Sequence, residues 1–226
     1  AGAAAGRAPW IAFQDSDDLW RPDKLRRQMA ALDAWEGDCI AAYCGMEIRD
    51  AAGAVTGVVP DPAVRPCAGS IVADLVWGSL VSTQTLVLRR DIFERIGGFD
   101  PEMPALQDWD LMLRAAPLGD VAFVDADLVE QRLSDNSITR SSAKRLQAQQ
   151  RILGNHAALW AAYPMAQAHH LYRIAGGHRM AGDRRQALEA ARAACRLVPR
   201  SLKYRAMAAY LQLAACLPGP RMGRAA

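Results

Sequence analysis

Three closely spaced aspartates, Asp15, Asp17 and Asp18, are the residues in this sequence best suited to do chemistry, and they follow the apolar run Trp10-Ile-Ala-Phe13. Such a run predicts a buried strand, and carboxylates just after a buried strand point toward a ligand crevice. Their mutual repulsion is usually tolerated when a cation or a hydroxyl-rich ligand neutralises them. Oxygen ligands in this number suit Mg²⁺ or Mn²⁺, which would bind a diphosphate. The alternative is an acidic turn that caps the following helix.

The elements that must position these aspartates alternate between strand and helix patterns up to about residue 138. This alternation predicts an α/β layer built on a mainly parallel sheet. From Ile138 onward Ala, Leu, Arg and Gln dominate, which favours helix throughout. The expected strands are 10–13, 39–48, 54–59, 83–88, 121–124 and 128–133, and the expected helices are 22–35, 71–77, 91–96 and 107–116.

Charge divides the chain at nearly the same place. Residues 1–136 hold 12 Lys and Arg against 22 Asp and Glu, a net of −10, whereas residues 137–226 hold 15 against 2, a net of +13. Such asymmetry predicts two regions with different surroundings. We therefore expect one domain over 1–138 and a helical region over 139–226.

The helical region contains a repeat-like pattern that resembles one tetratricopeptide-type hairpin, namely Leu171, Ala175, Gly182, Ala187, Ala194 and Pro199. The resemblance predicts two antiparallel helices that turn at Gly182-Asp183, then a helix over 201–217. Ala175, Ala187 and Ala194 would be buried, and the arginines of the second helix would be exposed. These arginines are Arg184, Arg185, Arg192 and Arg196. A plain helical tail without repeat character is the alternative.

Three blocks of sequence resemble glycosyltransferase family 2. The first contains Asp15, Asp17, Asp18, Trp20, Pro22, Lys24 and Leu25; the second is Arg89-Arg-Asp-Ile-Phe-Glu-Arg-Ile-Gly-Gly-Phe-Asp-Pro101; the third is Gln107-Asp-Trp-Asp-Leu111 with Arg114. They occur in the order that the family shows, and the resemblance covers residues 1–138. It implies a GT-A-like sheet and the transfer of a sugar from a nucleotide-sugar donor to an acceptor hydroxyl.

The resemblance also implies a role for individual residues. Asp15, Asp17 and Asp18 would bind the donor, with Asp17 and Asp18 as ligands of Mg²⁺ or Mn²⁺. Asp108 matches the family's catalytic base in an inverting reaction, and the positive end of the helix dipole would keep it ionised. Its alternative role is an ordinary helix cap. Gly98, Phe99 and Asp100 would line the acceptor side, with Trp109 as a pocket wall or core residue.

This sequence departs from the family pattern at three places. Gln107 replaces the common Glu, and Ser134, close to Arg132, stands where relatives have a histidine. The family's first βαβ portion, which binds the nucleotide base, does not precede Ala1. We therefore expect the chain to begin in mid-protein, without a signal peptide, and to be inactive by itself.

Two other classes of function can be built on the same sequence. A strand followed by Asp-x-Asp also opens haloacid-dehalogenase-like phosphohydrolases, but Leu19 follows the cluster here and a matching lysine block is missing. A non-catalytic glycosyltransferase-like scaffold is the other alternative. The basic region could contact anionic lipid or an anionic glycan, or simply be solvated; nucleic acid is disfavoured because no aromatic interleaving or known motif accompanies the charge.

Cysteine content and hydropathy bear on the compartment. The five cysteines form no Cys-x-x-Cys pair, which favours reduced thiols and a cytoplasmic protein. No stretch reaches the ~20 apolar residues that a membrane span needs. We expect a cytoplasmic enzyme, and peripheral contact with the inner face of the membrane through the basic region is one of the alternatives for that region. The acceptor would be a glycan, a lipid-linked sugar or a protein, as in the synthesis of cell-envelope polysaccharide.

Overall fold

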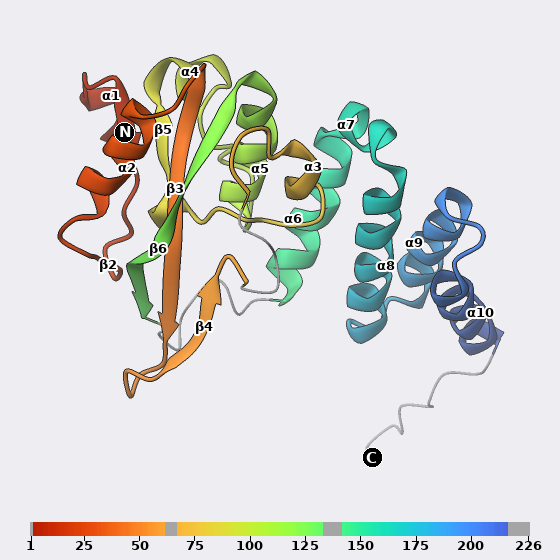
Figure 1. Cartoon of the computed structure of the whole chain (residues 1–226). Helices are drawn as coiled ribbons and strands as arrows, with labels where there is room; N and C mark the ends of the chain where they lie inside the picture. Colours follow the sequence, from red (N-terminus) through yellow and green to blue (C-terminus); the bar gives the residue numbers. More distant parts are fainter. Residues whose placement is uncertain (1, 62–66, 133–141, 217–226) are drawn as a thin grey trace. The chain divides into compact units, whose positions relative to one another are not determined.

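The computed structural model describes residues 2–61, 67–132 and 142–216 (Figure 1). The chain divides into two compact units, Ala1–Arg140 and Ser141–Ala226. The first is an α/β unit and the second is a helical unit. Ser134 lies outside the described residues.

The α/β unit is built on a sheet of six strands, in the order β1-β5-β3-β6-β2 with β4 paired to β3. The strands are β1 (Trp10–Ala12), β2 (Leu19–Trp20), β3 (Cys39–Arg49), β4 (Val55–Val59), β5 (Val87–Arg89) and β6 (Asp120–Arg132). The expected α/β class is confirmed, but the expectation of a mainly parallel sheet was wrong. Among the described strands only β3 and β6 pair in parallel.

The connections explain this difference. A parallel pair needs a crossover of a dozen or more residues, whereas antiparallel neighbours can be joined by short links. The link between β3 and β4 is a turn at Gly53, whose φ of 84° suits glycine. The helices that looked like crossovers are short: α3 (Val72–Leu75) has 4 residues and α4 (Arg90–Arg95) has 6. The predicted strand over 83–88 begins instead with the 3₁₀ turn Thr83–Thr85, and β6 is one continuous strand where two were expected.

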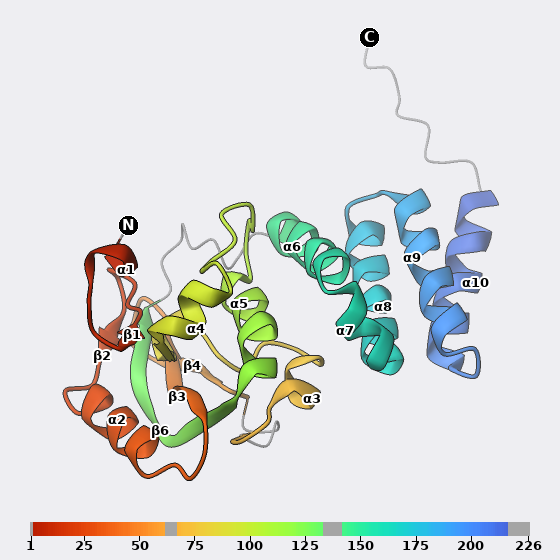
Figure 2. The same ribbon diagram turned by 90° about the horizontal axis from the view of Figure 1, so that it is seen from above.

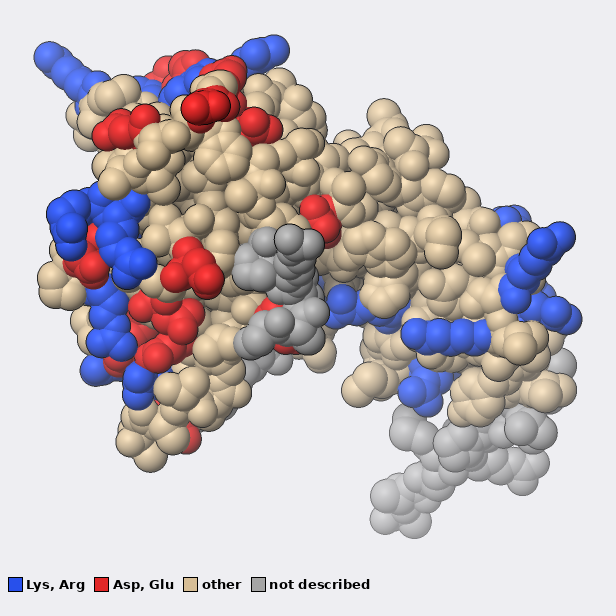
Figure 3. Space-filling view, viewed as in Figure 1, with Lys and Arg blue, Asp and Glu red and all other residues tan. Residues whose placement is uncertain are grey.

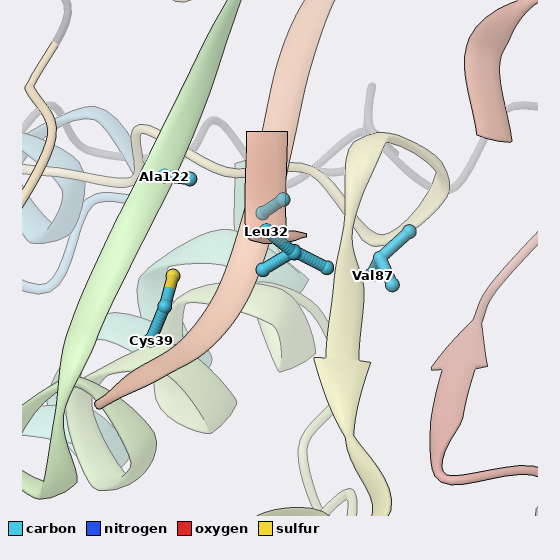
Figure 4. Packing of buried hydrophobic residues seen from close by; sticks show 5 residues of the cluster. Leu32, Cys39, Val87 and Ala122 are labelled. Carbon is cyan, nitrogen blue, oxygen red and sulfur yellow. The ribbon is translucent and has the colours of Figure 1, made fainter. Parts of the chain in front are cut away.

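Helices cover both faces of this sheet. The N-terminal α1 spans Gly2–Ala5, α2 spans Lys24–Asp33, and α5 spans Gln107–Ala115 and continues into the 3₁₀ turn Ala116–Leu118. Figure 2 shows α2 on one face and α5 on the other. Leu32 of α2 packs on Cys39, Ala42, Val87 and Ala122 of three neighbouring strands (Figure 4). Because residues on both faces of β3 are buried, this strand is the centre of the core.

Over residues 142–216, the helical unit consists of α6 (Ser142–Asn155), α7 (Ala157–Ala162), α8 (Pro164–Met180), α9 (Arg184–Leu197) and α10 (Leu202–Cys216). The chain turns between α8 and α9 at Gly182, with φ of 81°, and Asp183 caps α9 by accepting a hydrogen bond from the Gln186 N–H at 3.0 Å. This confirms the predicted turn and, within a residue, the predicted start of the third helix; its predicted last residue, Leu217, lies outside the described residues.

The packing of α8 against α9 depends on small side chains. Ala175, Ala187 and Ala194 are all 0% exposed, as the sequence predicted, and Leu211 of α10 packs on the same cluster. Small residues let helix backbones approach closely, so these positions tolerate little added volume. The four arginines expected to be exposed on α9 are exposed.

The thiols and the length of the helices bear on the expected compartment. Cys39, Cys44, Cys67 and Cys195 are free thiols. Within the described ranges, no helix is both long and apolar enough to cross a membrane.

Candidate active site

Residues 15–18, here called the acidic segment, lie shortly after β1 and are fixed to the rest of the unit through Asp18. Asp18 is only 4% exposed, and its Oδ2 accepts a hydrogen bond of 2.7 Å from Nε2 of Gln84 in the 3₁₀ turn before β5. The backbone N–H of Arg132, the last residue of β6, also bonds to the Asp18 carboxyl group. Asp15 and Asp17 are exposed. The segment therefore combines one anchored carboxylate with two that are open to solvent.

The three carboxylates influence one another electrostatically. The pKa of Asp18 is raised to about 6, first by burial and then by repulsion from Asp15 and Asp17, although the bonds from Gln84 and Arg132 oppose the shift. The pKa of Asp15 is raised by the partial desolvation of its carboxylate, although the residue is exposed, and then by the charge of Asp17. A bound cation would relieve this repulsion. The donor chemistry fits Mg²⁺ or Mn²⁺, but nowhere in the described ranges do three His, Cys, Asp or Glu side chains already converge as a metal site.

A cluster of three phenylalanines joins the acidic segment to the Gly97–Asp100 loop. Phe13 precedes the acidic residues, Phe93 lies on α4, and Phe99 belongs to the loop. The ring centroid of Phe13 lies 5.5 Å from that of Phe93 and 5.2 Å from that of Phe99, and Phe93 and Phe99 are 5.8 Å apart. Contacts of this geometry stabilise beyond the area they bury. Aromatic side chains that are 80 and 86 positions apart in sequence therefore bring these two blocks together.

Gly98 is required by the shape of this loop. Its φ is 70°, and a Cβ atom at this position would lie 2.9 Å from Cζ of Phe93. Its N–H donates to the carbonyl of Phe93 at 2.8 Å, and so ends α4. The next carboxylate, Asp100, accepts a hydrogen bond from the Glu102 N–H at 2.9 Å and stabilises its own turn.

Arg114 joins the same loop to α5. Its Nη1 donates to the carbonyls of Ile96 and Gly98 at 2.7 and 2.8 Å. Its Nε and Nη2 donate to Oδ2 of Asp110 at 3.0 and 2.6 Å, and Asp110 is only 1% exposed. A planar guanidinium is suited to such a set of bonds because its five N–H donors point in fixed directions. Arg114 thereby fixes the third sequence block against the second.

Asp108 lies in the first turn of α5, and one of its contacts is a hydrogen bond from a backbone N–H at the start of this helix. Its Oδ1 accepts a hydrogen bond of 2.7 Å from the Trp109 N–H. The residue before the helix, Leu106, has φ of 59° and ψ of 31°, the left-handed conformation that a leucine rarely adopts. Strain of this kind persists where the surroundings impose it, and it concentrates at functional sites.

Two residues of the sequence blocks occupy the interior instead of a surface. Trp109 is 3% exposed, and its indole N–H donates to the Leu75 carbonyl at 2.7 Å, so its contacts are those of a core residue. Lys24 is 1% exposed, with Nζ 3.9 Å from the centroid of the Trp20 ring. Burial lowers the pKa of Lys24 to about 8. Both residues support the elements around the site.

Sequence reasoning missed the side chains that hold the blocks together. Gln84 lies in a stretch that was expected to be a strand, and nothing in its neighbourhood pointed to Asp18. Arg114 was noticed as part of a motif, but its bonds to Ile96 and Gly98 connect segments whose proximity only the fold reveals. Phe13 and Phe93 carry a weak signal, because each lies beside a motif residue.

The comparisons with known proteins agree with this arrangement at the level of class. No protein-family model matches the chain. An uncharacterized glycosyltransferase of Rickettsia typhi is 24% identical over 158 residues, which are 70% of this chain and 48% of that protein. One of Rickettsia prowazekii is 22% identical over 142 residues, 62% of this chain and 45% of that protein. The chain thus spans about half the length of these curated relatives.

Solved structures share the fold. TarS of S. aureus superposes with a TM-score of 0.54 at 13% identity, covering 95% of this chain and 39% of that one. A mannosyltransferase of Pyrobaculum calidifontis, in complex with GDP-Man and Mn²⁺, gives 0.51 at 17% identity, covering 95% of this chain and 63% of that one. The sequence relatives are named as glycosyltransferases, and one structural neighbour is a mannosyltransferase. The class that fold and relatives support is therefore glycosyltransferase.

Proposed function

We propose that this chain contributes the acceptor side and part of the donor side of an inverting, metal-dependent glycosyltransferase of family 2 with a GT-A fold. The observation that carries the proposal is the meeting of three distant sequence blocks. Phe13 and Phe99 join the acidic segment to the Gly97–Asp100 loop, and Arg114 joins that loop to the helix of Asp108. The curated relatives and the structural neighbours support the same class.

In the proposed reaction, the carboxylate of Asp108 removes the proton of an acceptor hydroxyl as the hydroxyl oxygen attacks the anomeric carbon of the donor sugar. The bond to the nucleoside diphosphate breaks at the same carbon. Asp15, Asp17 and Asp18 hold the donor, and Asp17 and Asp18 would ligate Mg²⁺ or Mn²⁺. When bound, such a cation supplies charge to stabilise the departing diphosphate.

The acceptor would meet the protein at the Gly97–Asp100 loop. Gly98 fixes the shape of the loop, Phe99 joins it to the acidic segment, and Asp100 stabilises the turn that follows. Trp109 contributes from the interior as a support. We propose a glycan, a lipid-linked sugar or a protein as the acceptor, within a cytoplasmic pathway of polysaccharide synthesis.

The same proposal assigns residues 1–138 to the catalytic domain and 139–226 to a tetratricopeptide-like helical appendage. Because the chain spans about half of its curated relatives, we propose that turnover needs the longer protein. A haloacid-dehalogenase-like hydrolase and a non-catalytic scaffold remain the competing classes, and neither the fold relatives nor a contact in the site favours them.

Metal dependence provides the experiment. In the full-length protein, donor turnover should require Mg²⁺ or Mn²⁺ and stop in excess chelator, and Asp17→Ala should abolish it. Asp33→Ala is the matched control, because Asp33 is an exposed carboxylate at the end of α2, outside the acidic segment. Full turnover in chelator, or an active Asp17→Ala variant, would contradict the metal assignment.

A further inference from the structure

The helical unit carries many more basic than acidic side chains. Its described residues, 142–216, hold 12 Lys and Arg but only Asp183 and Glu189 as acidic residues, and the sequence has no carboxylate side chain from residue 190 to 226. On the face shown in Figure 3, the charged side chains of this unit are mainly blue, whereas the α/β unit shows both red and blue side chains. The two acids are engaged locally, since Glu189 pairs with Arg185 at 3.0 Å and Asp183 caps α9.

The corner between α9 and α10 concentrates this charge in a short segment. Arg196, Arg200 and Lys203 are exposed, and in the described part of the helical unit none of them pairs with a carboxylate. Lys203 extends over the ring of Tyr172, with Nζ 4.4 Å from the ring centroid. The local potential reaches a neighbouring group: the pKa of His169 is lowered by burial and then by the charges of Arg173 and Lys203.

Large apolar side chains are exposed within the same corner. Leu202 is 76% exposed and Leu197 is 36% exposed, and both alternate along the chain with the three cations. Solubility alone does not account for exposed leucines next to cations that have no carboxylate partner in the described part of the unit. A soluble polyanion would engage the cations but leave the leucines in water. A phospholipid surface would engage both, with phosphates facing the cations and the leucines entering the headgroup region.

We propose that the Arg196–Lys203 corner docks on an anionic phospholipid surface. The net of −10 over residues 1–136 means that the α/β unit would be repelled by such a surface, so the attraction must come from the helical unit. The proposal does not depend on glycosyl transfer, because docking is an equilibrium that can be measured without donor or acceptor.

The test is co-sedimentation of the chain with vesicles of phosphatidylcholine alone and of phosphatidylcholine mixed with phosphatidylglycerol. We expect binding to the mixed vesicles only, weakened by added salt. Arg196→Gln combined with Arg200→Gln should weaken binding about thirtyfold, since each basic residue near such a surface contributes roughly a fivefold factor. Leu202→Ser should weaken it by about tenfold.

The matched control is Arg179→Gln combined with Arg185→Gln. It removes the same charge from exposed positions of the same unit, but Arg185 lies eleven residues from Arg196, roughly 16 Å along the helix. Binding should survive in this variant. Circular dichroism checks that each variant is folded. If the arginine variant is unfolded, the binding of Leu202→Ser shows whether the corner contacts the vesicles.

Three results would overturn the proposal. The first is equal binding to both kinds of vesicle, or to neither. The second is an equal loss in the control, which would mean that net charge alone acts. The third is an unchanged Leu202→Ser variant whose binding is displaced by a soluble polyanion such as heparin, which would assign the corner to a polymer instead of a membrane.

Discussion

The contacts that stabilise the α/β unit differ in kind from those that stabilise the helical unit. In the α/β unit, single side chains bridge segments that are far apart in sequence, as Gln84 does to Asp18 at 2.7 Å and Arg114 does to Gly98 at 2.8 Å. In the helical unit, α8, α9 and α10 pack on one another in chain order, and alanines such as Ala187 and Ala191 form the contact. The first arrangement can build a chemical site from distant residues, whereas the second provides a support with a free outer surface.

The largest effect should come from breaking a long-range bridge in the α/β unit. Arg114→Ala leaves the Asp110 carboxylate buried without its guanidinium partner and frees the carbonyls of Ile96 and Gly98. We expect a loss of about 3 kcal/mol in the free energy of unfolding, measured by urea denaturation. Arg95→Ala, an exposed arginine at the end of α4, should change it by less than about 0.5 kcal/mol. Equal effects would mean that the bridge is dispensable.

An intermediate effect should come from overpacking the helical unit. Ala191 is 1% exposed between α9 and its neighbours, so Ala191→Leu forces extra volume into a tight contact. We expect a cost of about 2 kcal/mol in the unfolding of this unit, observed as a lower melting temperature by circular dichroism. Ala209→Leu, at an exposed position of α10, is the control and should be nearly neutral. A tolerated Ala191→Leu would show that the helices are loosely packed and would weaken the comparison.

The smallest effect concerns the electrostatic cost of the acidic segment. Because the pKa of Asp18 is raised to about 6 in the folded chain, its protonated form is favoured by folding. Its contribution to stability is therefore present below the ordinary pKa of 3.8 and is lost as pH rises through about 6. Asp18→Asn should remove this dependence and raise the stability at neutral pH by about 1 kcal/mol, while Gln84 keeps an oxygen acceptor.

The control for this pH effect is Asp33→Asn, an exposed carboxylate in α2 that should leave the profile unchanged. Stability profiles between pH 4 and 7 that coincide for wild type and Asp18→Asn would contradict the raised pKa. Bound Mn²⁺ with a nucleoside diphosphate should reduce the difference, since a cation lowers the cost of the ionised form.

The sequence predicted local structure well and spatial relations poorly. The turn at Gly182, the buried alanines and the start of α5 at Gln107 all follow from patterns within a few residues. The prediction of a mainly parallel sheet was wrong because the relative direction of two strands depends on the path of the chain between them. Local sequence patterns do not contain this information. For the same reason Asp15, Asp108 and Phe99 could be named as candidates, but Gln84 and Arg114 acquire their roles only through contacts across the fold.

The most direct test of the account is the Asp108→Asn variant of the full-length protein. The amide keeps the shape of the carboxylate but cannot take the acceptor proton, so turnover should fall by about a thousandfold while donor binding changes little. Glu94→Gln, an exposed carboxylate on α4, should leave both quantities unchanged. An Asp108→Asn variant with near-normal turnover would leave Asp108 as a helix-terminal residue and contradict its assignment as the base.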